Sequence, residues 1–186
     1  PVPQRGAKQQ PKKRDLAEER RLEIEQVYHE HGLKVGTVPK PELSNRAITK
    51  LRIEGKEIFA VPPEGVASYR QIMTAFGQAD HWTLTHEDRH KIVWEPLAEW
   101  RWIIVEVTPD CSRRGTCWND LNTAIYQLSL EEYAPVWHLH KALTGIILDQ
   151  RTFCWLRTRY RFSESGLGAL RAGGWHGEVR VRRDSS

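Results

Sequence analysis

Residues 155–162 constrain the fold most, because they alternate in character with the period of a β-strand. One set of alternate positions contains a tryptophan and three arginines: Trp155, Arg157, Arg159 and Arg161. The other set, of opposite parity, contains Leu156, Thr158, Tyr160 and Phe162. This pattern predicts a strand in an antiparallel sheet with one buried face and one basic, exposed face.

A second segment near the C-terminus repeats the pattern, because Val179 and Val181 alternate with Arg180 and Arg182. If the two segments pair as a β-hairpin, five arginines share one face of the sheet. Like charges side by side destabilise a sheet. The hairpin therefore indicates an anionic partner.

The distribution of charge supports this interpretation. The formal net charge of the 186-residue chain is +4, but residues 1–14 alone carry five basic residues and no acid. Residues 151–186 carry eight arginines and three acids, which leaves an acidic body over residues 15–150. Segregated charge favours oriented binding to an anionic surface such as nucleic acid.

Composition excludes several classes of protein. The chain has only three cysteines and no Cys-x-x-Cys pair, which argues against a disulfide scaffold and for an intracellular, reducing compartment. The longest apolar runs, such as residues 102–105, are far shorter than a membrane span, so no membrane partner is expected. No secretion signal is recognisable at the basic N-terminus. No Gly-rich phosphate loop is present, so no cofactor is expected.

Hydrophobic periodicity and capping residues predict the elements. Helices are expected at residues 15–31, 45–51, 68–76, 118–128 and 130–143. Strands are expected at residues 91–95, 100–107, 155–162 and 179–182, with a hairpin over 51–61 and a loop over 163–174. Blocks of helices and strands without βαβ alternation predict an α+β fold, a mainly antiparallel sheet packed against a few helices.

The expected organisation is a flexible basic arm, residues 1–14, followed by a single domain, residues 15–186. Residues 15–65 could also form a separate helical and hairpin subdomain. Their order of helix, short helix and hairpin matches a winged helix, although the loop over 33–43 is too short for the missing middle helix.

The strongest enzymatic signal is Gly115-Thr116-Cys117-Trp118 ahead of the helix expected at 118–128. A helix N-terminus favours a thiolate and offers backbone donors for an oxyanion. This segment resembles the nucleophile region of papain-like cysteine proteases, including compact viral leader proteases. The resemblance implies Cys117 as nucleophile and His176, which precedes a predicted strand, as general base. The alternative interpretation is that Cys117 is a structural cysteine.

Metal sites are not expected. Residues 86–90 match the pattern His-Glu-x-x-His, but they lead directly into the strand expected at 91–95 and contain no apolar residue for a buried helix face. His138 and His140 are two residues apart in a helical pattern, so their side chains diverge.

The sequence therefore favours a non-enzymatic binding protein whose partner is nucleic acid, with RNA slightly ahead of DNA. The phosphate-binding residues would be Arg157, Arg159, Arg161, Arg180 and Arg182, with Lys12, Lys13 and Arg14 adding non-specific attraction. Trp155 would either stack on a base or cover the arginine stems by cation–π contact. Two alternatives stay open. One is a protein–protein adaptor that contacts an acidic protein surface, in a homo-oligomer or a larger assembly. The other is the papain-like hydrolase.

Overall fold

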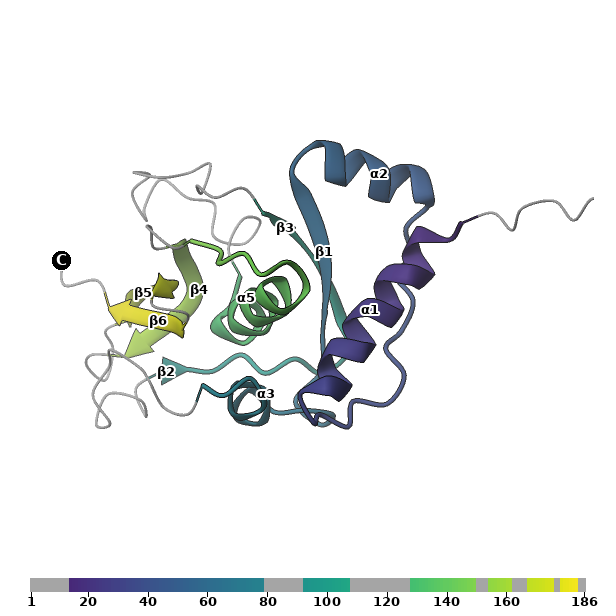
Figure 1. Ribbon diagram of the computed structural model, residues 1–186. Coiled ribbons are helices and arrows are strands. Elements are labelled where there is room, and N and C mark those ends of the chain that lie inside the picture. The colour runs from purple at the N-terminus through teal and green to yellow at the C-terminus, as the bar shows by residue number, and fades with distance from the viewer. Residues whose placement is uncertain are drawn as a thin grey trace, which may run out of the picture.

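The computed structural model of the chain describes residues 14–78, 92–107, 128–149, 154–161, 167–175 and 178–183 (Figure 1). Its helices are α1 (Leu16–Glu30), α2 (Asn45–Ile53), α3 (Tyr69–Ala75) and α5 (Leu130–Thr144). Its strands are β1 (Lys56–Val61), β2 (Ile92–Val93), β3 (Arg101–Glu106), β4 (Cys154–Arg161), β5 (Leu167–Trp175) and β6 (Glu178–Arg183). The predicted α+β fold with antiparallel sheets is confirmed.

Helix α5 lies at the centre of the molecule. It packs against β1 on one side and β4 on the other, so it separates a two-stranded sheet, β1-β3, from a four-stranded sheet, β2-β4-β5-β6 (Figure 1). Every residue from Leu130 to His140 is buried. A helix that is buried on all sides must sit inside the core. One continuous cluster of buried side chains runs from Ile24 through Phe59 and Trp137 to Leu156.

Serine caps set the starts of three helices. The hydroxyls of Ser44, Ser68 and Ser129 accept hydrogen bonds from the backbone N–H groups three residues further on. Such caps satisfy donors that the first turn of a helix leaves without a partner. Helix α5 ends at Gly145, whose φ of 72° lies in the left-handed region that glycine adopts readily.

Helix α1 covers the outer edge of β1. The buried Arg20 side chain donates from Nε to the carbonyl oxygen of Ile58 at 3.0 Å, and the Tyr28 hydroxyl donates to the carbonyl of Ala60 at 2.9 Å. Burial raises the pKa of Tyr28, so its hydroxyl stays protonated and remains a donor. A strand edge that would otherwise expose carbonyl groups is thereby closed.

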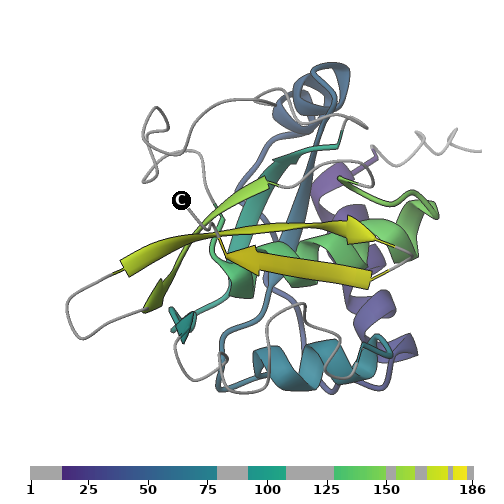
Figure 2. The same cartoon turned by 90° about the vertical axis from the view of Figure 1, so that its left-hand side faces the viewer.

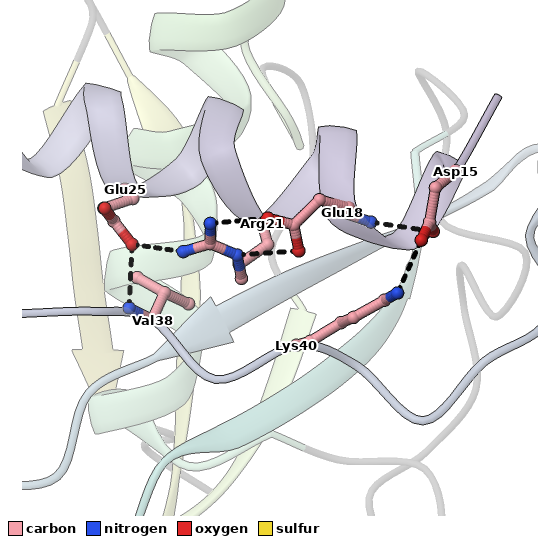
Figure 3. A network of polar contacts seen from close by, with 6 residues as sticks. All are labelled: Asp15, Glu18, Arg21, Glu25, Val38 and Lys40. Atoms are coloured by element: carbon pink, nitrogen blue, oxygen red, sulfur yellow. Dashed lines mark hydrogen bonds and ion pairs between the residues drawn. The ribbon is translucent and has the colours of Figure 1, made fainter. Parts of the chain in front are cut away.

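A polar network fastens the segment after α1 to the side of this helix. Six residues form it: Asp15, Glu18, Arg21, Glu25, Val38 and Lys40 (Figure 3). Glu25 accepts from the Val38 N–H at 2.9 Å and from Arg21 at 2.7 Å. Lys40 pairs with Asp15 at 2.6 Å. The network holds the extended residues 33–43 beside α1.

The structure corrects two sequence predictions. Residues 51–53 belong to α2, so the hairpin over 51–61 is wrong; β1 instead pairs with β3, from Lys56 opposite Glu106 to Val61 opposite Arg101. The loop expected over 163–174 is also wrong from residue 167 onward, since β5 occupies Leu167–Trp175. Strand β5 lies between β4 and β6, so the two arginine-bearing strands do not pair with each other.

No helix within the described ranges is both long enough and apolar enough to pass through a bilayer.

Candidate nucleic-acid interface

The four-stranded sheet turns one face toward α5. Its described buried residues are Ile92 on β2, Leu156 and Thr158 on β4, Ala172 on β5 and Val181 on β6. Because side chains alternate along a strand, these positions identify the parity that faces the core. The predicted alternation of β4 is confirmed at Leu156 and Thr158, and Arg161, of the opposite parity, is exposed.

The opposite face extends over three arginine-bearing strands. The register places Arg171 of β5 directly opposite both Trp155 of β4 and Arg182 of β6. The next position of the same parity on β5, Gly173, lies opposite Arg180. In Figure 2 these three strands cross the front of the molecule, and α5 and α1 lie behind them. The core-opposite face of β4, β5 and β6, called the arginine face below, is therefore continuous across the three strands.

Arg171 was missed by the sequence analysis, because residues 163–174 were interpreted as a loop. The period-two signal was nevertheless present in Leu170-Arg171-Ala172, and Ala172 is buried as that alternation requires. With Arg171 and Arg183 included, β4, β5 and β6 contain seven arginines and a single acid, Glu178.

Two arginines of β4 differ in their surroundings. Arg161 is exposed, whereas Arg159 is half-buried and lies opposite Val93 of β2. Burial lowers the pKa of Arg159, and the carboxylate of Glu95 acts in the opposite direction. Arg159 is thus anchored at the β2 side of the sheet, and Arg161 is the more accessible of the two for a partner.

A buried hydrogen-bond network fixes β4 to α5. The Leu130 N–H donates to Thr158 Oγ1 at 2.7 Å, and this hydroxyl is 3.4 Å from Glu131 Oε2. Glu131 Oε1 accepts from the Glu95 N–H at 2.5 Å. Burial raises the pKa of Glu131, and hydrogen bonds from its own N–H, the Glu95 N–H and the Ser129 side chain partly offset this. The register of β4 with β5 shifts between Leu156 and Arg159, next to Thr158, and a β-bulge of this kind can redirect a side chain.

The loop before β4 is held by α5 as well. The Trp137 indole donates to the Leu148 carbonyl at 2.9 Å, and the Tyr133 hydroxyl donates to Asp149 at the same distance. Asp149 has a φ of 50°, a left-handed conformation that Asp tolerates better than most residues. Helix α5 is therefore bonded both to β4, at Thr158, and to residues 148–149.

The basic arm is only partly within the described residues. Lys12 and Lys13 lie outside them. Arg14 is described, and its Nε donates to both carboxylate oxygens of Glu19 at 2.8 Å. Figure 1 shows the start of α1 on the side of the molecule opposite β4–β6, so Arg14 and the arginine face do not form one surface patch.

The predicted catalytic pair, Cys117 and His176, lies outside the described residues, as does the His-Glu-x-x-His segment at 86–90. The papain-like hypothesis therefore stays a prediction. In the part of the chain that the structure describes, no group of three or more His, Cys, Asp or Glu residues is arranged to hold a metal ion.

His138 and His140 make separate contacts in the core. His138 Nε2 lies 2.9 Å from Gln78 Oε1, and its ring stacks on Phe76 at 4.9 Å between centroids. Burial lowers the pKa of His138 to about 3, with smaller effects from Lys141 and His31. His140 Nδ1 lies 3.0 Å from the Ile146 carbonyl, and burial lowers its pKa too. Both rings are therefore neutral at physiological pH.

No protein-family model matches this chain, and neither does any curated protein sequence or solved structure.

Proposed function

We propose that this protein binds nucleic acid through the arginine face, with RNA ahead of DNA. The observation that carries the proposal is the concentration of six arginines and one acid, Glu178, at the core-opposite positions of three adjacent strands. Phosphate groups carry the complementary charge, and phosphate contacts dominate the affinity of proteins for nucleic acids.

The shape of the scaffold supports the same function. The face opposite α5 is not needed for the core, because the buried residues of these strands have the other parity. The elements beneath it are held by buried hydrogen bonds from α5, so the arginines lie on a rigid support. A pre-ordered site loses less entropy when it binds.

The test is a titration of nuclease-treated protein with a labelled RNA of about 20 nucleotides, followed by fluorescence anisotropy at salt concentrations from about 50 to 200 mM. Affinity should fall steeply with salt, and the double variant Arg161→Gln with Arg182→Gln should bind more weakly and with a shallower salt dependence. Each lost phosphate contact should reduce the slope of log K against log salt by roughly 0.7 to 0.9.

The matched control is Arg46→Gln with Arg70→Gln, which removes the same charge from exposed positions on α2 and α3. This control should retain most of the affinity. If both double variants bind equally well, or if wild-type binding does not depend on salt, the proposal is wrong. A protein that carries no nucleic acid and elutes as a defined oligomer would favour the adaptor hypothesis instead.

A further inference from the structure

The register of the four-stranded sheet narrows the class of nucleic acid, provided that the proposed function holds. We infer that the arginine face takes single-stranded nucleic acid, with Trp155 and Trp175 as the two stacking positions. Neither Arg171 nor Trp175 was connected with function by the sequence pattern, and only the position of β5 between β4 and β6 brings them into this site.

The two tryptophans belong to the same face. Trp155 lies opposite Arg171, and Trp175 follows Arg171 by four residues on β5, so it has the same parity. With a rise of about 3.3 Å per residue, the two positions are roughly 13 Å apart along the strands. Aromatic rings at intervals along a basic surface are typical of proteins that bind single strands, because every base has a face that can stack.

The residue between these positions leaves the backbone accessible. Gly173 lies midway between Arg171 and Trp175 in the alternation, and its register partner is Arg180. A glycine inside a strand weakens the strand, but it permits close approach of a ligand to the main chain. Arg182 and Arg180 of β6 therefore flank the line from Trp155 as far as Gly173, which adds no side chain at its centre, and Glu178 lies opposite Trp175 at its end.

The width of the face argues against a duplex. The row Trp155, Arg171 and Arg182 crosses three strands, which is about 10 Å between backbones before side chains are counted. The major groove of DNA is about 12 Å wide and admits a helix or a two-stranded ribbon. The major groove of an RNA duplex is deep and narrow, so side chains cannot reach its bases. A duplex could thus touch this face only at its phosphates and would leave the tryptophans without bases.

The spacing also sets a minimum length for the ligand. Stacked bases repeat every 3.4 Å along one strand, so about 13 Å corresponds to roughly four steps, which join about five nucleotides. Stacked oligonucleotides shorter than about five residues should therefore bind weakly, because they cannot reach both tryptophans. Further length should add smaller increments through phosphate contacts.

The experiment measures anisotropy with a labelled single-stranded RNA, the corresponding DNA and the duplex of each, all of about 12 nucleotides. The key variants are Trp155→Leu, which removes the ring, and Trp155→Phe, which retains a stacking surface. Trp155→Leu should weaken single-strand binding by about 5- to 150-fold, the range for loss of one stacked base. Trp155→Phe should lose far less, and neither variant should change the salt slope. Arg171→Gln should reduce that slope by roughly 0.7.

The outcomes separate this inference from the proposed function. If duplexes bind as tightly as single strands, or if the Leu and Phe variants lose equally, the single-strand inference is wrong, while weaker binding by Arg171→Gln would still support a phosphate-binding face. If no nucleic acid binds, both fail. Thermal unfolding verifies that Trp155→Leu is folded; should it unfold, Trp175→Leu and Trp175→Phe provide the same comparison on β5. Comparison of the RNA and DNA arms shows which sugar is preferred.

Discussion

Helix α1 and the β4–β6 strands use arginine in opposite ways. Helix α1 contains five glutamates and two arginines, and each arginine contacts two carboxylates: Arg20 pairs with Glu23 and Glu57, and Arg21 with Glu18 and Glu25. Strands β4–β6 contain seven arginines and one acid. In helix α1 the arginines form ion pairs with glutamates of the same chain and so stabilise the fold. In the second region the strands themselves contain one acid, so arginine is not matched by carboxylates within the same elements.

Burial makes the contrast sharper. The Arg20 side chain is only 7% exposed and reaches the edge of β1 beneath α1, whereas Arg161 is exposed at the end of β4. Removal of a buried, paired charge leaves its partners without compensation, while removal of an exposed charge does not. The same substitution should therefore affect folding in one region and binding in the other.

The largest effect on stability should come from Arg20→Ala. This change leaves the buried Ile58 carbonyl without its donor and removes the cation over the Phe59 ring, while Glu57 keeps Arg52 as a partner; the free energy of unfolding should fall by about 2 to 4 kcal/mol. Urea denaturation measures it. A loss no larger than that of Arg161→Ala would remove the basis of the comparison between the two regions.

Acid should destabilise the fold through His138, next to α3. The folded-state pKa of this residue is about 3, below the ordinary value of 6.5. Between these two pH values the ring is protonated in the unfolded chain and neutral in the folded chain. The stability that the neutral ring provides is complete above pH 6.5 and is lost as the pH falls toward 3. Between pH 6.5 and 5 the free energy of unfolding should fall by at most about 1.4 kcal/mol per pH unit. The total loss over this range is therefore at most roughly 2 kcal/mol.

Urea denaturation of the wild type and of His138→Phe over this pH range measures the effect of the histidine. In the variant, the free energy of unfolding should change less steeply with pH, by the equivalent of about one proton, whatever its absolute stability. The pKa of His140 is lowered as well and this residue remains in both proteins, so it contributes to the slope that remains in the variant. Equal slopes would show that the His138 ring is not held neutral by the fold.

Tyr28→Phe should have a smaller effect, because the ring stays and only the hydroxyl is lost. The Ala60 carbonyl at the edge of β1 would then lack its buried donor, at a cost of about 1 to 2 kcal/mol. Thermal or urea unfolding of the variant measures this loss. No change would mean that water reaches the β1 edge and that α1 closes it less completely than the geometry indicates.

The smallest effect on stability is expected for Arg161→Gln, within about 0.5 kcal/mol of the wild type. Its affinity for RNA should nevertheless fall, since the residue is exposed on the arginine face. Arg46→Gln on α2 is the matched control and should leave both stability and affinity nearly unchanged. Together these two variants test whether an exposed arginine on the arginine face differs from one on α2 in binding alone.

Local signals in the sequence were sufficient for most elements. The start of α5 follows from its serine cap and its end from Gly145, and β4 follows from strict alternation. These features depend on neighbours in the sequence, so sequence patterns predict them.

The errors lie where distant contacts decide the structure. Strand β5 contains Gly168, Gly173 and Gly174, and glycine is depleted in strands, so the segment was interpreted as a loop. Its pairing on both sides with β4 and β6 overrides that preference. Likewise the residues of β3 that pair with β1 lie 40 to 50 positions further along the chain, and no local pattern identifies them. The charge of the arginine face was thus predictable, but its width and the position of Arg171 on it were not.

Because α5 lies at the centre of the molecule, hydrogen exchange in this helix should respond to ligand binding on the sheet. Its first turn is bonded to Thr158 of β4, and the buried core is continuous from α1 to Val181 of β6. A ligand that binds only the folded state raises the free energy of global opening, by about 2.7 kcal/mol at a hundred times its dissociation constant. Amide hydrogens of α5, which touch no ligand, should then exchange more slowly with deuterium when the arginine face is occupied.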